Sequence, residues 1–191
     1  MLVGDVGFYQ RAEIKDALAL LRLAASPDDG QSDEAFRRAC NTPPRGIGPK
    51  ALDLLERDAE WRGSSLLAAC HTADLPARVR GAEGAFADAV RSVAADTGAT
   101  VADRLSMLLD RTGYRQWLRD SRAETVEGRL ENLAELVLLA GGFHSATDLL
   151  EHAALASAAP GEEAGGRVQL LTLHRAKGLE FAHVFLPAWN T

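Results

Sequence analysis

The stretch TLHRAKGLEF, residues 172–181, lies between two apolar runs, VQLL at 168–171 and VFL at 184–186. Short apolar runs bounded by turn residues are typical of buried strands, so the pattern predicts a strand, a polar loop and a second strand. Sites of α/β proteins form in such loops, at the carboxyl ends of strands. The loop carries a hydroxyl, an imidazole, two cations and a carboxylate. Its donors suit phosphates, and its carboxylate suits a hydroxyl group or a cation.

Three further segments precede this loop. FYQRAEIKD stands at 8–16, NTPPRGIGPK at 41–50 and EGRLENL at 127–133. With TLHRAKGLEF they resemble, in the same order, segments of the UvrD/Rep/PcrA-like superfamily 1 DNA helicases. TLHRAKGLEF is similar to motif V of that family, the first two segments to the beginning of its 2B insertion, and EGRLENL, more weakly, to a later 2B helix.

The resemblance implies that the chain is a fragment of an ATP-dependent 3′-to-5′ DNA helicase of DNA repair or replication. It places residues 1–11 in a remnant of motor domain 2A, residues 12–160 in the helical 2B subdomain, and residues 161–191 in the motif V segment of domain 2A. The expected fold is therefore mainly α, with a helix-hairpin-helix-like turn and a few strands of an incomplete RecA-like α/β domain at the two ends.

Amphipathic spacing and the Gly and Pro breakers set the limits of the helices within the 2B part. We expect a short strand at Leu2-Val3, a linker at 157–166, and hinges in this linker and at Gly7–Arg11. The expected helices are 13–25, 33–40, 49–61, 64–69, 81–95, 101–111, 114–120, 127–139 and 146–156.

The segment RGIGPK, residues 45–50, predicts a DNA contact. Its glycine–hydrophobic–glycine core (residues 46–48, here named the GIG turn) permits a tight turn with outward-facing backbone N–H groups, and a proline suits the first position of the next helix. Such amides and the positive end of the helix dipole favour a phosphate. A turn that only joins two helices, or the hairpin of a glycosylase-type or polymerase-type domain, remains an alternative. The predicted duplex contacts are Arg45, Gly46, Ile47, Gly48 and Lys50.

By the same resemblance, the motif V residues divide between DNA and nucleotide. Thr172 and His174 would face the single-stranded DNA track. Gly178 and Glu180 would lie towards the nucleotide, Glu180 through a hydrogen bond to the ribose or to a water near the phosphates. Arg175 stands where the family has a small or polar residue, so no family role carries over to it.

The 191 residues contain no G-x-x-x-x-G-K-[ST] phosphate cradle. The family's acidic magnesium-binding motif and its later arginine-bearing motif are also absent from them. The resemblance implies ATP and Mg²⁺ as cofactors of the full-length enzyme. For the isolated chain we expect no catalytic residue, no cofactor and no ATP hydrolysis.

Arg11, Glu13, Lys15 and Asp16 form a charged first turn of the first expected helix. In the family this segment lies at the joint between domains 2A and 2B, which suggests bonding between domains. We favour the simpler interpretation of a salt-bridged structural turn.

Composition limits the choice of partners. A net charge of −6 means that phosphate contacts must be local. Cys40 and Cys70 give neither a disulfide framework nor metal-ligand spacing, and we expect two buried thiols in a reducing cytoplasm and no metal site. No apolar stretch approaches the ~20 residues that span a bilayer, and no signal-peptide pattern begins the chain. The expected partners are DNA and the rest of the helicase motor.

Two other functions stay open. One is a non-catalytic module that binds duplex DNA or docks a protein through the GIG turn and the helical faces. The other is a fragment of a helicase–nuclease of the AddA/RecB type. Flanking sequence would discriminate between them, because a nuclease domain adds a cluster of acidic residues. The sequence does not decide the pathway.

Overall fold

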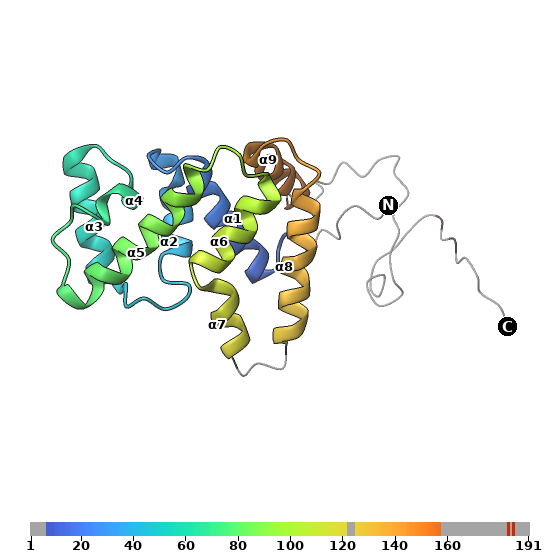
Figure 1. Cartoon of the computed structure of the whole chain (residues 1–191), viewed down its shortest axis with the longest axis horizontal. Coiled ribbons are helices and arrows are strands. Elements are labelled where there is room, and N and C mark those ends of the chain that lie inside the picture. Colours follow the sequence, from blue (N-terminus) through green and yellow to red (C-terminus); the bar gives the residue numbers. More distant parts are fainter. Residues whose placement is uncertain (1–6, 122–124, 158–182, 184, 186–191) are drawn as a thin grey trace. The chain divides into compact units, whose positions relative to one another are not determined.

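The computed structural model describes residues 7–121, 125–157, 183 and 185 (Figure 1). The chain divides into two compact units, Met1–Ala159 and Pro160–Thr191. Only His183 and Phe185 of the second unit are described. The expected strands at 2–3 and 168–171, the linker beyond Ser157 and the whole of TLHRAKGLEF therefore lie outside the described residues. Of the expected buried strand at 184–186 only Phe185 is described, and it is exposed and lies outside any strand.

Helices make up the described part of the first unit, and no strand occurs there. This confirms the expectation of a mainly α fold. None of the described helices is long and apolar enough to cross a membrane. The helices are α1 (Ala12–Ala25), the short 3₁₀ helix η1 (Gly30–Ser32), α2 (Asp33–Ala39), α3 (Pro49–Arg62), α4 (Leu66–Ala69), α5 (Ala77–Ala94), α6 (Val101–Arg111), α7 (Tyr114–Asp120), α8 (Val126–Ala140) and α9 (Ala146–Ser157).

The largest departure from the expected limits is the start of α5. The sequence analysis predicts a helix from Gly81. The structure begins α5 at Ala77, directly after Pro76. Val79, in the added turn, is buried. Burial of this side chain offsets the low helix propensity of Gly81, as tertiary packing commonly overrides propensity.

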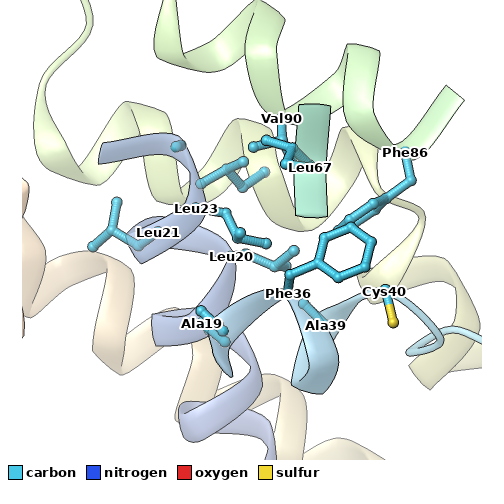
Figure 2. Close-up of a cluster of buried hydrophobic side chains, with 14 of the residues drawn as sticks. Ala19, Leu20, Leu21, Leu23, Phe36, Ala39, Cys40, Leu67, Phe86 and Val90 are labelled. Carbon is cyan, nitrogen blue, oxygen red and sulfur yellow. The ribbon is translucent and has the colours of Figure 1, made fainter. Parts of the chain in front are cut away.

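Helix α1 lies at the centre of the helical body and packs against α2, α5, α6, α8 and α9. Its sequence is apolar on nearly every face, as expected of a helix surrounded by others. Leu20 and Leu23 pack among the side chains of α2, α4 and α5 (Figure 2). The rings of Phe36 and Phe86 meet there edge to face, with centroids 6.0 Å apart. This cluster holds α2 and α5 together, and the loop after α2 carries the GIG turn.

The chain enters and leaves the helical body at one place. Gln10 Nε2 donates a hydrogen bond of 2.9 Å to the backbone oxygen of Ser157, 147 residues further along the chain. Phe8 and Tyr9 are buried, and the Tyr9 ring packs edge to face against His152 of α9. Part of the expected hinge at Gly7–Arg11 is thus packed onto the body, while hinge motion itself stays a prediction.

Candidate nucleic-acid interface

The GIG turn lies in the loop between α2 and α3. In Figure 1, α3 and α4 lie at one end of the helical body and α8 at the other. Gly46 has φ +81°, a left-handed conformation that favours glycine. The Ile47 side chain is buried in the core, whereas Gly46 and Gly48 are exposed. Ile47 thereby anchors the turn and leaves its two glycines at the surface, in front of Pro49 at the first position of α3.

Asn41 organises the backbone amides of this loop. Its Oδ1 accepts hydrogen bonds from the N–H groups of Arg45 at 2.7 Å and Ile47 at 3.3 Å. The Gly48 N–H donates to the Gly46 oxygen at 3.0 Å. Within the described part of the chain, the N–H groups of Gly46 and Lys50 have no acceptor. The outward-facing amides expected from the sequence are thus reduced to these two.

The side chain of Arg45 is occupied by backbone carbonyls. Its Nη1 lies 2.9 Å from the oxygen of Cys40 and 3.2 Å from those of Ala39 and Pro43. Its Nη2 donates to the oxygen of Thr112 at 2.7 Å. The expectation that the Arg45 guanidinium faces a DNA phosphate does not agree with these contacts.

Lys50 supplies the accessible charge at this end of α3. The residue is exposed, and it makes no ion pair with any described residue. It sits in the first turn of a 14-residue helix that carries no acidic residue in that turn. Its ammonium and its free N–H group therefore add to the positive end of the helix dipole.

A buried carboxylate faces this loop from α5. Glu83 is 0% exposed, and its Oε1 has no hydrogen-bond partner. Its Oε2 accepts only a weak hydrogen bond from the Cys70 thiol, at 3.7 Å. Burial raises the pKa of Glu83 to about 7, against opposing contributions from Cys70 and the positive charge of Arg45. This residue was not among those predicted from the sequence.

The two cysteines are free and buried, which confirms that part of the expectation. Burial, together with the charge of Glu83, raises the pKa of the Cys40 thiol to about 11. Burial and Glu83 also raise the pKa of the Cys70 thiol. Both groups are therefore neutral thiols, poor nucleophiles and poor metal ligands at neutral pH. Across the described ranges, no three His, Cys, Asp or Glu side chains are grouped so that they can hold a metal ion.

Charged residues of the first turn of α1 bond to α8 and α2 and not to one another, and the choice between a structural turn and a joint between domains stays a prediction. Glu13 Oε1 accepts from Asn132 Nδ2 at 2.7 Å, and Glu13 Oε2 accepts from Arg129 Nε at 3.2 Å. The Oδ1 atom of Asn132 in turn accepts from Arg11 Nη1. The segments FYQRAEIKD and EGRLENL, far apart in the chain, thus meet where α1 packs on α8.

Asp16 forms a second buried contact on the same helix. Its Oδ2 accepts from the Tyr114 hydroxyl at 2.8 Å, and its Oδ1 lies 2.7 Å from Arg38 Nη2. Burial, and then the hydrogen bond to Asp16, raise the pKa of Tyr114, so this hydroxyl stays a donor. For Lys15 the structure gives no ion pair with a described residue.

Four predicted site residues, Thr172, His174, Gly178 and Glu180, lie outside the described residues. Their assignments stay predictions. The described part of the candidate interface consists of the GIG turn, Lys50 and the residues that hold them.

Comparisons with known proteins give the family of the chain. The family model of the UvrD-like helicase C-terminal domain matches residues 1–75 and 85–191. The chain is 33% identical to the ATP-dependent DNA helicase PcrA of Bacillus subtilis over 97% of its own length and 27% of that protein. It is 34% identical to DNA helicase II of Escherichia coli, with the same coverage of both chains. It is also 34% identical to the ATP-dependent DNA helicase UvrD1 of Mycobacterium bovis, over 99% of this chain and 28% of that protein.

The chain thus spans about three tenths or less of the length of these relatives. The match includes the segments that carry α1, the GIG turn and TLHRAKGLEF. The chain belongs to the family of UvrD-like helicase C-terminal domains.

Proposed function

We propose that the chain is the 2B subdomain, with flanking parts of motor domain 2A, of an ATP-dependent DNA helicase that unwinds DNA in the 3′-to-5′ direction. The observation that carries this proposal is the similarity of nearly the whole chain to one stretch of ATP-dependent DNA helicases. The contact between residues 10 and 157 supports it further, because an inserted subdomain must leave and rejoin its host at one place. The parent enzyme would act on DNA in the cytoplasm, in repair or replication.

Within this enzyme, the GIG turn would contact the backbone of duplex DNA. Two free N–H groups, at Gly46 and Lys50, and the Lys50 ammonium lie together at the amino end of α3. Donors of this kind bind phosphates and fix the position of a protein on DNA without reading its sequence. The turn would therefore act as a helix-hairpin-helix-like element. The contacts of Arg45 and the buried side chain of Ile47 would fix it to the helical body.

The predicted motif V residues would complete the function in domain 2A. Thr172 and His174 would contact the single strand, and Gly178 and Glu180 would lie towards ATP and its Mg²⁺. Other parts of the motor would supply the phosphate cradle and the magnesium-binding acid.

Lys50→Met tests the duplex contact. We expect the 191-residue chain to bind duplex DNA weakly, and the variant to bind all sequences more weakly by a similar factor. The plot of log affinity against log salt has a negative slope. Its magnitude should decrease by about 0.9, since one phosphate contact is lost. Fluorescence anisotropy with a labelled duplex at several salt concentrations measures both quantities.

Lys15→Met, the same change on α1, is the matched control and should leave the slope unaltered. Equal slopes for wild type and Lys50→Met would show that Lys50 contacts no phosphate and that any DNA-binding surface lies elsewhere on the chain.

The isolated 191-residue chain should hydrolyse no ATP, with or without DNA. Phosphoryl transfer requires a phosphate cradle and a bound metal ion, and the sequence carries the motif for neither. A phosphate-release assay on a sample free of contaminating ATPases measures this. DNA-stimulated turnover by such a sample would contradict the assignment of the chain to 2B and motif V alone.

A further inference from the structure

Arg45 connects the base of the GIG turn to the ends of two helices. Ala39 is the last residue of α2, and Cys40 is its carboxyl-terminal cap. Thr112 is the carboxyl-terminal cap of α6. The last carbonyl groups of a helix have no partner within it, and they carry the negative end of its dipole. A single guanidinium therefore neutralises and bonds the carboxyl ends of both α2 and α6.

The guanidinium is also held from the side of α5. Its Cζ atom lies 4.5 Å from the centroid of the Phe86 ring, in cation–π geometry. Glu83 lies one turn earlier on the same helix and faces it with negative charge. Arg45 thus contacts or faces α2, α5 and α6, and in the sequence it directly precedes Gly46.

We propose that Arg45 is a positioning residue for the DNA contact. It fixes the direction of the GIG turn relative to α5 and α6 and donates no hydrogen bond to a phosphate itself. This inference rests on the proposed duplex contact of the GIG turn. It replaces the direct DNA contact that the sequence predicted for Arg45 by an indirect role.

The planar fork of arginine explains why lysine would not serve here. Four carbonyl oxygens, at the ends of α2 and α6 and in the loop after α2, surround two nitrogens of one rigid group. An ammonium is a single point and does not reach both helix ends in the same geometry. Loss of the connection to Thr112 would leave the GIG turn attached through Ile47 and Asn41.

Salt dependence distinguishes the positioning role from a phosphate contact. In the 191-residue chain, Arg45→Met should weaken duplex binding by about tenfold, because bonds to a charged group are lost at the base of the turn. Its salt slope should equal that of wild type, whereas Lys50→Met lowers the slope by about 0.9. A slope lowered in Arg45→Met as much as in Lys50→Met would overturn the proposal, since it would mean that the guanidinium neutralises a phosphate.

Amide hydrogen exchange tests the same role without DNA. The Ile47 N–H is bonded to Asn41 within the loop, and its exchange should accelerate by at least about tenfold in Arg45→Met. The amide of Leu55, in the middle of α3, should keep its rate. Arg45→Lys keeps the charge and is the second variant, used if Arg45→Met does not fold. It should also accelerate exchange at Ile47, and unchanged exchange there in a folded Arg45→Lys protein would overturn the proposal.

The experiments distinguish failure of the proposed duplex contact from failure of the proposed positioning role of Arg45. If the wild-type chain binds no duplex, the proposed function of the GIG turn fails. The exchange rates then still report whether Arg45 holds the turn. If duplex binding is present and Ile47 exchange is unaffected by both Arg45 variants, only the positioning role fails.

Discussion

Glu83→Gln is expected to stabilise the protein relative to wild type by about 3 kcal/mol more at pH 8 than at pH 4.5. Burial raises the pKa of Glu83 to about 7 in the folded state, from an ordinary value of 4.5. Below pH 4.5 the Glu83 carboxyl is protonated in both the folded and the unfolded state, so its burial costs no ionisation energy and the protein has its full stability. As pH rises towards 7, the unfolded chain ionises freely while the folded chain must ionise a buried group. Stability is therefore lost across this interval and is constant above it.

Urea unfolding at pH values between 4.5 and 8 measures this difference. Glutamine keeps the shape of the side chain but does not ionise, so the variant should lack this part of the pH dependence. Glu60→Gln is the matched control, because Glu60 is exposed on α3. A difference between Glu83→Gln and wild type that is the same at pH 4.5 and pH 8 would contradict the expectation.

The buried Glu83, when ionised, and the half-buried Arg45 face each other without an ion pair in the described structure. Burial lowers the pKa of Arg45, while the negative charge of ionised Glu83 opposes this shift. Hydrogen bonds to backbone carbonyls compensate the Arg45 guanidinium for its loss of water, whereas the Glu83 carboxylate accepts only a weak hydrogen bond from the Cys70 thiol. The unfavourable group is thus the carboxylate, and its charge is tolerated beside the guanidinium that holds the GIG turn.

Local sequence signals were sufficient for most of the helix limits. Helix α6 was predicted with its correct bounds, and in the structure Thr100 and Asp103 form a capping box at its start. Helix α3 begins at Pro49 and ends before Gly63, which adopts φ +64°. These signals lie within a few residues of each helix end, where backbone preference decides the conformation.

Such local signals do not predict contacts between residues that are far apart in the sequence. Nothing near Arg45 in the sequence indicates Thr112, 67 positions away, as its acceptor. A free phosphate contact and a buried helix cap require the same residue type, and only the packing of α6 against the loop distinguishes them. The predicted DNA contacts of the GIG turn and Arg45 therefore stay predictions, and the structure adds the carbonyl contacts of Arg45 that no local signal indicated.

Glu83 did have a signal in the sequence. The buried positions of α5 include Val79, Phe86, Ala87 and Val90, and Glu83 lies on the same helical face. A carboxylate inside an apolar stripe predicts either a buried partner or a raised pKa. The default expectation that charged residues are solvated does not hold at this position.

The second large effect concerns Glu13, a buried glutamate at the start of α1. Glu13→Ala is expected to lower the free energy of unfolding by about 3 kcal/mol at pH 7, because it breaks a buried ion pair and leaves Arg129 and Asn132 without their acceptor. Glu131→Ala is the matched control, since Glu131 is exposed on the same helix as Arg129. Urea unfolding measures both changes. A loss at Glu13 no larger than at Glu131 would contradict the structural role of this contact.

The pH dependence of Glu13 has the opposite sign to that of Glu83. Burial alone raises the pKa of Glu13, but the hydrogen bond from Asn132 and the charge of Arg129 together lower it below its ordinary value of 4.5. The stability from Glu13 is therefore present above pH 4.5 and is lost as pH falls through the lowered pKa. The cost of Glu13→Ala should shrink below pH 4.5, whereas the gain from Glu83→Gln should appear only above it. Two glutamates of similar burial thus differ because Glu13 has strong donors and Glu83 has a thiol.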